Sequence, residues 1–187
     1  QTKEVIDAAA SKWNFMKFYP GLVGGHCISV DPLYLSFKQK KLGLSSSLID
    51  IASKVNKSKV NEIVKILTRE KKKIKILILG ATFKENCPDF RNSGSLNIVK
   101  NLNKKKIIPD LHDPYIIDKR NKTFKGYKFN HILKFKSINY DFILISVAHD
   151  IYKTIGVEKI RKFSNNKDCK IFDLKSIFPK NKVNYQL

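Results

Sequence analysis

The chain has 187 residues, of which 42% are hydrophobic, enough to build one ordinary core or two small ones. Lysine and arginine number 37 against 16 aspartates and glutamates, so the formal net charge is +21. Only four of these basic residues are arginine, the side chain that reads bases and phosphates in bidentate fashion. The charge therefore indicates a lysine-rich surface rather than a nucleic-acid-binding protein. The sequence contains no apolar run long enough to predict a membrane span.

The three cysteines, Cys27, Cys87 and Cys169, are odd in number, widely spaced and outside any Cys-x-x-Cys motif. This pattern predicts neither a disulfide framework nor a zinc site, so we expect no metal and a reducing, cytoplasmic setting. The sequence starts at Gln1 with neither an initiator methionine nor a signal peptide. We expect it to be part of a longer protein.

The first part of the chain has helical patterns around one irregular segment. Glycines and a proline within residues 18–27 predict that this segment is irregular. Asp31 followed by Pro32 predicts a helix start with Asp31 as N-cap, and Gly43 predicts its end. The remaining helices are expected over residues 4–13 and 45–70. The longer of these has an apolar stripe that needs a partner surface, either in a dimer or within the chain.

The second part alternates short apolar runs with helical patterns. Strands are expected over residues 74–79, 107–108, 142–147 and 170–174, and helices over residues 95–102 and 157–163. Such alternation predicts an α/β fold with a parallel, doubly wound sheet. We therefore expect a helical domain over residues 1–69 and a Rossmann-like domain over residues 70–187, with a solvated basic run at residues 71–73 between the secondary-structure elements.

The glycine-rich segment that contains Cys27 is the most informative part of the sequence. Glycines let the backbone approach a ligand closely, and Cys27 stands four residues before an expected helix start. The positive end of a helix favours a thiolate, which is the nucleophilic form of cysteine. Asp31 could cap the helix, orient a water molecule or do both, and His26 is expected to shape the pocket. The alternative is that Cys27 is a buried structural residue in a glycine turn.

These residues resemble a known family. Residues 18–27 and 31–35 look like the active-site segment of the nucleotide-sugar 6-dehydrogenases, the UDP-glucose/GDP-mannose dehydrogenase family. Residues 79–93 are similar to the family's Gly-x-x-Phe-Lys…Asp-x-Arg-x-Ser stretch, and residues 148–150 and 172–175 give further matches. The Gly-Gly-His-Cys form resembles the branch that acts on UDP-N-acetylhexosamines. The resemblance implies a central helical domain and a C-terminal UDP-binding domain.

The resemblance also implies an activity in polysaccharide precursor biosynthesis. Two NAD⁺ molecules in succession would oxidise the C6 alcohol of a UDP-sugar to a uronic acid. Cys27 matches the cysteine that attacks the aldehyde intermediate, giving a thiohemiacetal that is oxidised to a thioester and then hydrolysed. Asp31 matches the aspartate that assists the water steps. A covalent hemiacetal would retain the aldehyde between the two oxidations.

Binding roles follow from the same resemblance. The expected substrate-binding residues are Phe18, Tyr19, Gly21 and Gly24, which match the segment that wraps the sugar and diphosphate, together with Lys84 and Lys175. Arg91 and Cys27 match residues that contact NAD. Without the resemblance, Lys84 is an exposed lysine after a strand, and Arg91 is the ion-pair partner of Asp89.

The sequence departs from the family pattern in several ways. Cys87 stands where a threonine or serine is usual, which predicts a second thiol near the pocket, and Ser53 replaces a common arginine on the long helix. The family's N-terminal Rossmann domain, with its Gly-x-Gly-x-x-Gly loop, and the helix that carries its catalytic lysine and asparagine are absent from this sequence. We therefore expect a homodimer through the helical domain but no turnover by the chain alone. Alternatives are a non-catalytic UDP-sugar-binding or dimerising fragment, a UDP-glucose 6-dehydrogenase, and a polyanion-binding basic protein.

Overall fold

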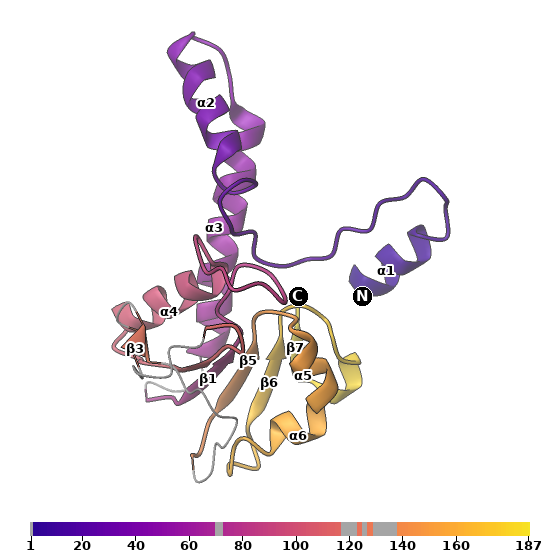
Figure 1. The fold of residues 1–187 in the computed structure, drawn as a ribbon, viewed down its shortest axis with the longest axis vertical. Helices are drawn as coiled ribbons and strands as arrows, with labels where there is room; N and C mark the ends of the chain where they lie inside the picture. Colours follow the sequence, from indigo (N-terminus) through magenta and orange to yellow (C-terminus); the bar gives the residue numbers. More distant parts are fainter. Residues whose placement is uncertain (1, 70–72, 117–122, 125–126, 129–137) are drawn as a thin grey trace.

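The architecture was examined in a computed structural model (Figure 1). It describes residues 2–69, 73–116, 123–124, 127–128 and 138–187. Two of the three lysines of the expected basic run, Lys71 and Lys72, lie outside the described residues.

The second part of the chain forms the parallel sheet that the sequence predicts. The strands lie in the order β2-β1-β5-β6-β7, and each neighbouring pair is parallel. Their bounds are β1 Ile76–Leu79, β2 Asp110–His112, β5 Phe142–Ile145, β6 Lys170–Asp173 and β7 Tyr185–Gln186. A separate antiparallel pair consists of β3 Thr123–Phe124 and β4 Tyr127–Lys128. The predicted α/β fold class is confirmed.

The sheet is buried on both faces because its strand side chains alternate between two cores. Ile76, Ile78 and Leu144 belong to the core that includes α3 Ser47–Leu67 and α4 Gly94–Lys104. The side chains between them in sequence face a second core that includes α5 Asp150–Ile155 and α6 Val157–Arg161. Figure 1 shows the two pairs of helices on opposite sides of the sheet. This doubly wound arrangement gathers the loops after the parallel strands at one edge.

The helices of the first part extend away from the sheet (Figure 1). Helix α2 Asp31–Lys41 and the first half of α3 form a projecting hairpin, the arm. The buried residues of α3 all lie between Val60 and Leu67, where the helix packs on the sheet domain. Helix α1 Thr2–Ala9 has no buried residue. It ends earlier than predicted, and Trp13, which the helical spacing included, is 92% exposed, so no apolar contact at Trp13 extends the helix.

Several details differ from the sequence-based expectations. Residues 107–108 are not a strand: Ile108 is 78% exposed, Lys106 has a φ of 62°, and the strand begins only after Pro109. A left-handed residue and a proline cannot continue a regular ladder at this point. Asp31 is the first residue of α2 rather than its N-cap, which is Val30. Short elements that the patterns did not predict are α5, the 3₁₀ turn Lys180–Lys182, β7 and the β3–β4 pair.

Among the helices of the described ranges, none combines the length and the hydropathy that crossing a bilayer requires.

Candidate functional site

The glycine-rich loop before α2 lies directly against the loop that follows β1. A methyl group added at Gly24 would meet the backbone oxygen of Asn92 at 2.7 Å and Cβ of Phe83 at 3.2 Å. Gly25, with a φ of 88°, would meet the Phe83 ring at 2.9 Å. The Asn92 side-chain amide donates a 3.1 Å hydrogen bond to the Gly25 carbonyl. Glycine is required at Gly24 and Gly25 because only its missing side chain permits so close a contact.

Helix α3 holds the same loop from its other side. Asn56 accepts a hydrogen bond from the Val23 amide at 3.0 Å and donates one to the Val23 carbonyl at 2.9 Å. This reciprocal pair satisfies both backbone groups of one loop residue. The loop is thus fixed between the long helix and the carboxyl edge of the sheet.

A small pocket at this edge contains both lysines that the sequence singled out. Lys84 follows β1 and Lys175 follows β6, while Ser95 lies in the first turn of α4. Gly21 packs on Lys175, since a methyl group added at Gly21 would lie 2.9 Å from Nζ. The remaining lining residues are Leu22, Thr82, Phe83, Glu85, Gly94, Ser146 and Val147. Two ammonium groups beside a helix N-terminus favour an anionic ligand, and Glu85 is the only carboxylate among the lining residues.

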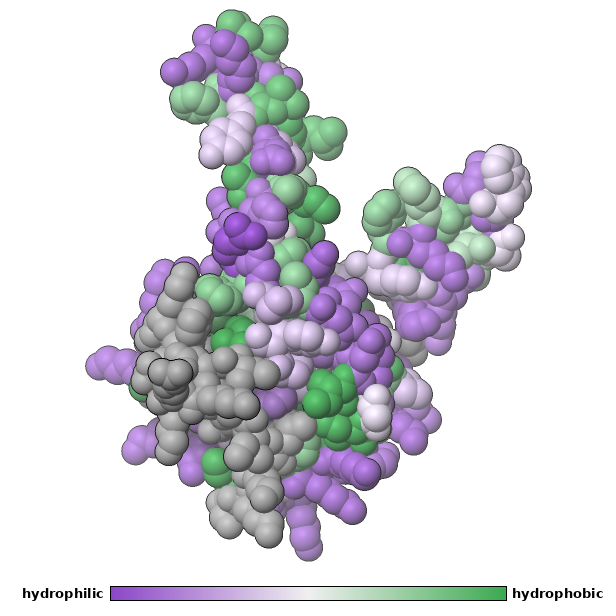
Figure 2. All heavy atoms as spheres, in the orientation of Figure 1, coloured by the Kyte–Doolittle hydropathy of each residue, from purple (hydrophilic) through white to green (hydrophobic). Residues whose placement is uncertain are grey.

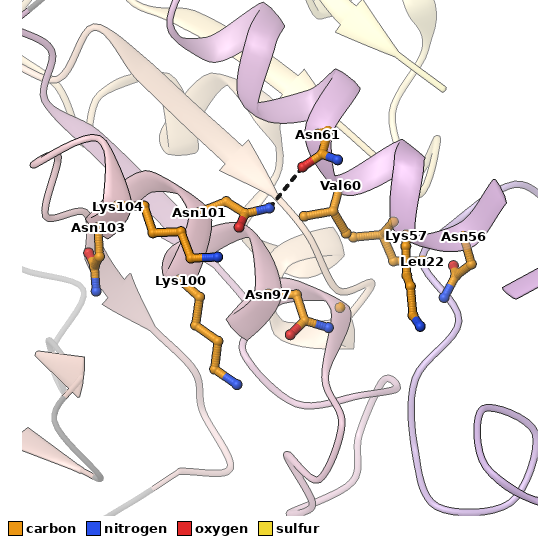
Figure 3. Close-up of a pocket in the computed structure, with 11 residues that line it drawn as sticks. Leu22, Asn56, Lys57, Val60, Asn61, Asn97, Lys100, Asn101, Asn103 and Lys104 are labelled. Atoms are coloured by element: carbon orange, nitrogen blue, oxygen red, sulfur yellow. Dashed lines mark hydrogen bonds between the residues drawn. The ribbon is translucent and has the colours of Figure 1, made fainter. Parts of the chain in front are cut away.

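Leu22 fills the pocket in this conformation. Its Cβ would lie 2.4 Å from a methyl group added at Gly94, and the free volume is about 10 Å³, no more than one water needs. Leu22 and Gly94 also border a larger groove of about 830 Å³ between α3 and α4 (Figure 3). Lysine and asparagine side chains line most of that groove, among them Lys57 and Lys100. A shift of Leu22 would therefore join the two spaces.

Cys27 lies at the surface rather than in a hydrophobic core. Its thiol is free and exposed, and its carbonyl accepts hydrogen bonds from the amides of Val30 at 2.9 Å and Asp31 at 2.8 Å. These bonds tie Cys27 to the turn that leads into α2. Asp31 is exposed at the start of that helix. The alternative of a buried structural cysteine therefore does not hold for Cys27.

Arg91 is close enough to Cys27 for their charges to interact. The guanidinium binds the Asp89 carboxylate through Nε and Nη2, with a shortest distance of 2.6 Å. This hydrogen bond holds the pKa of Asp89 down at about 2, and Asp89 in turn raises the pKa of Arg91. Smaller electrostatic contributions to the Arg91 pKa come from Cys27 and Cys87. The expected ion pair with Asp89 therefore exists, and it holds a positive charge near two thiols.

Phe18 and Tyr19 lie apart from the two lysines. Phe18 is 74% exposed, and the Tyr19 hydroxyl donates a 2.6 Å hydrogen bond to Asp7 of α1. The structure thus brings together Gly21, Gly24, Lys84 and Lys175 along one loop contact but leaves these two aromatic residues on the connection to α1.

Some pocket residues were not singled out from the sequence. Thr82, Ser95 and Ser146 line the pocket, and the hydroxyls of Ser95 and Ser146 lie 2.6 Å apart. The Ser93-Gly94-Ser95 sequence directly before an apolar helical pattern was an available signal for a helix N-terminus that binds anions. Ser146 offered no comparable signal, because it is one polar residue after a buried strand.

Comparison with known proteins assigns both parts of the chain. Residues 1–58 match the central domain of the UDP-glucose/GDP-mannose dehydrogenase family, and residues 77–180 match that family's UDP binding domain. The chain belongs to the UDP-glucose/GDP-mannose dehydrogenase family. The family resemblance drawn from the Cys27 and Lys84 motifs is thereby confirmed.

Relatives within the dehydrogenase family match nearly the whole chain. The UDP-N-acetyl-D-glucosamine 6-dehydrogenase of Salmonella typhi is 38% identical over 185 residues, covering 95% of this chain and 43% of the relative. The enzyme of the same name from Pseudomonas aeruginosa is 35% identical over 193 residues, covering 100% and 45%. The chain thus spans less than half the length of these relatives.

Solved structures support the dehydrogenase fold. A UDP-glucose dehydrogenase from Pyrobaculum islandicum superposes with a TM-score of 0.78 at 18% identity, covering 98% of this chain and 42% of that one. An NDP-N-acetyl-D-galactosaminuronic acid dehydrogenase from Methanosarcina mazei gives 0.78 at 22% identity, covering 96% and 41%.

The described residues do not form a complete site for NAD, the cofactor of this dehydrogenase family. The two amides directly after Gly80, which a dinucleotide-phosphate loop would offer to a ligand, both donate to the buried Asp113 carboxylate, at 2.7 and 3.0 Å. Arg91 is the candidate NAD contact predicted beside Cys27. The amides after Gly80 therefore do not form a cradle for a dinucleotide phosphate.

Proposed function

We propose that the chain supplies the UDP-sugar-binding half of an NAD-dependent UDP-N-acetylhexosamine 6-dehydrogenase and carries its nucleophile. The observation that carries this proposal is the pocket in which Lys84, Lys175 and the start of α4 converge beside the Cys27 loop. The names of the Salmonella and Pseudomonas relatives favour an N-acetylhexosamine over glucose.

The binding chemistry follows from charge and geometry. The diphosphate would lie between the two lysine ammonium groups, with the hydroxyls of Thr82, Ser95 and Ser146 as further donors. The loop that contains Phe18, Tyr19, Gly21 and Gly24 would wrap the sugar and the diphosphate. Because the pocket now has room for at most one water, ligand binding must move Leu22 away from Gly94.

Cys27 would act on the aldehyde form of the sugar. Its thiolate would form a bond to C6 while the carbonyl electron pair moves to oxygen, which takes up a proton and gives a thiohemiacetal. Arg91 would stabilise the thiolate electrostatically, and Asp31 would orient water in the later hydrolysis. No oxidation step is assigned to the described residues, because they do not hold a complete NAD site. We therefore propose that the chain alone does not turn over.

We further propose a cytoplasmic protein with a helical unit over residues 1–69 and a UDP-binding unit over residues 70–187. The three cysteines are free, which suits a reducing compartment.

The arm supports a proposed homodimer. Leu48, Ile51 and Val55 lie on one face of α3 and are each more than half exposed. Figure 2 shows hydrophobic residues gathered along this projecting part of the molecule. Such an apolar surface favours a partner, and a second copy of the chain would cover it symmetrically.

Calorimetric titration of the chain with UDP and with UDP-N-acetylglucosamine tests the binding role. We expect Lys84→Ala to weaken UDP binding by roughly tenfold to a hundredfold, the value of one charge-assisted hydrogen bond. Cys27→Ala is the matched control, because it removes the nucleophile and should leave UDP affinity within about twofold.

Three results would separate the alternatives. Equal affinity in the wild type and Lys84→Ala would contradict a phosphate role for Lys84. Steady NADH production by the wild-type chain with NAD⁺ and UDP-N-acetylglucosamine would contradict its inactivity alone. If the wild-type chain bound DNA with a steep salt dependence and did not bind UDP, the polyanion-binding alternative would be favoured.

A further inference from the structure

The loop after β1, residues 81–87, carries Lys84, and buried side chains hold it near its start and near its end. At its start, Asp113 accepts hydrogen bonds from the backbone amides of Ala81 at 2.7 Å and Thr82 at 3.0 Å. Burial alone would raise the pKa of Asp113, but its hydrogen bonds, led by that from His149, hold the pKa below its ordinary value. A charged, fully buried carboxylate is therefore one anchor of the loop.

The second anchor is His149, which is completely buried just before α5. Its Nδ1 accepts a 3.0 Å hydrogen bond from the backbone amide of Asn86. The neutral ring therefore carries its proton on Nε2. Nε2 lies 3.1 Å from the Asp113 carboxylate and 3.1 Å from the Thr82 hydroxyl. Both nitrogens of His149 are thus engaged with the loop or with its other anchor.

The two loop residues that contact His149, Thr82 and Asn86, flank Lys84 in the sequence. The Thr82 hydroxyl, on one side, donates a 2.9 Å hydrogen bond to the Lys84 carbonyl. Asn86, on the other side, has a φ of 53°, a left-handed conformation that asparagine adopts more readily than most residues, and its backbone amide bonds to His149. The Asn86 side chain also donates to Asp150 at 2.6 Å. The backbone that carries Lys84 is therefore held at both ends by the segment 149–150.

We propose that His149 is a positioning residue for Lys84: it fixes the 82–86 backbone so that the Lys84 ammonium points to the bound diphosphate. This inference rests on the proposed role of Lys84 in UDP binding. His149 has no exposed surface with which to contact a ligand, so its effect on binding must pass through the loop. The His149 ring suits such a role because it is fully buried and both of its nitrogens are hydrogen-bonded. Residues of this kind, placed behind a binding group, keep that group in the geometry that binding requires.

A pair of substitutions separates the contact to Asn86 from simple packing. His149→Phe keeps a ring and removes both hydrogen-bonding nitrogens. His149→Asn places its side-chain oxygen where Nδ1 stands, so it retains an acceptor for the Asn86 amide while losing the contact to Asp113. His112→Phe is the control, because His112 is another buried histidine, whose Nδ1 lies 2.9 Å from the Tyr152 hydroxyl rather than against this loop.

The first measurement needs no ligand: amide hydrogen exchange of the chain, read at residues 82–87. We expect His149→Phe to speed exchange of the Asn86 amide by at least about tenfold, while His149→Asn and His112→Phe leave it within about threefold of the wild type. If the Asn86 amide in a folded His149→Phe variant stays as protected as in the wild type, the proposal is wrong.

The second measurement is a double-mutant cycle on UDP affinity. His149→Phe should weaken UDP binding by about tenfold when Lys84 is present and by less than about twofold in the Lys84→Ala background. His149→Asn, which keeps the acceptor for the Asn86 amide, should bind UDP with most of the wild-type affinity. An equal loss in both backgrounds would show that His149 affects binding by a general structural route, which overturns the proposal.

The two measurements also separate this inference from the proposed function. A wild-type chain without UDP affinity would contradict the proposed function and the ligand part of the inference together. UDP binding that depends on Lys84 and not on His149 would contradict the inference alone.

Discussion

At the scale of single residues, the three thiols differ in their surroundings and should differ in reactivity. Burial raises the pKa of Cys169 to about 11, whereas the Cys27 thiol is exposed. At pH 8, three units below that pKa, only about one Cys169 thiol in a thousand is the reactive thiolate. We expect iodoacetamide to label Cys27 first and Cys169 last in the native chain, as measured by peptide mass spectrometry. Labelling in denaturant is the control, and equal native rates would contradict the burial of Cys169.

Gly21 and Gly24 in the loop before α2 allow a sharper test at the same scale. A methyl group at Gly21 would meet the flexible end of Lys175, which can move aside. One at Gly24 would meet the Asn92 backbone oxygen at 2.7 Å, which cannot move without shifting the loop. Gly24→Ala should therefore lower the free energy of unfolding by about 1–3 kcal/mol, the cost of overpacking, and Gly21→Ala by much less. Urea denaturation of both variants measures this, and equal losses would contradict the docked loop.

At the scale of elements, α2 and α3 are joined through one carboxylate. The Asp50 side chain accepts hydrogen bonds from Lys40, Ser36 and Ser46, which lower its pKa from 3.8 to about 2, with the Lys40 contact the largest cause. Because the pKa is lower in the folded state, the contribution of Asp50 to stability is complete above pH 3.8 and disappears as the pH falls through about 2.

We therefore expect Asp50→Asn to be less stable than the wild type at pH 7, with the difference shrinking toward pH 2. Urea denaturation followed by circular dichroism at both pH values measures the difference. A gap between the two proteins that does not change with pH would show that the Asp50 charge does not hold the arm together.

The sequence predicted elements well where a pattern was repeated and poorly where a tertiary contact decided the outcome. The run from Phe142 is short and continuously apolar, and the stripe along α3 recurs at three- and four-residue steps, so their strand and helix could be predicted. β7 has two residues and exists only because Tyr185 pairs with Phe172 of β6. The Ile107–Ile108 pair looked like a strand because both residues are β-branched, but the turn at Lys106 and the proline that follows displace the ladder to Asp110. In the site, motifs could single out Lys84 and Lys175, but only the fold shows that Leu22 lines the same pocket and packs against Gly94.

At the scale of the whole molecule, α3 belongs to two environments. Near its end, Val60, Ile63, Val64 and Leu67 are buried in the sheet domain, whereas Leu48, Ile51 and Val55 near its start are 82%, 59% and 51% exposed. With about 3.6 residues per turn, the exposed residues lie on a different face of α3 from the buried ones, so packing on the sheet domain leaves them uncovered. An apolar helix face that its own chain leaves in solvent indicates a surface completed by another molecule. The arm projects from the globular part, so two arms can pack along their length without moving the pocket that Lys84 and Lys175 line (Figure 1).

The dimer proposal can be tested by placing a charge in the middle of this face. Burying an aliphatic side chain contributes about 1.5–3 kcal/mol, and a symmetric dimer carries the substitution in both copies, so Ile51→Asp should weaken self-association by at least about a hundredfold. Lys57→Asp changes charge on the opposite side of the same helix and is the matched control, expected to remain dimeric. Analytical ultracentrifugation over a concentration series measures both. A wild-type chain that sediments as a monomer at every concentration would contradict the dimer proposal. Leu48, Ile51 and Val55 would then remain exposed to water in solution, and the face of α3 on which they lie would not mediate self-association.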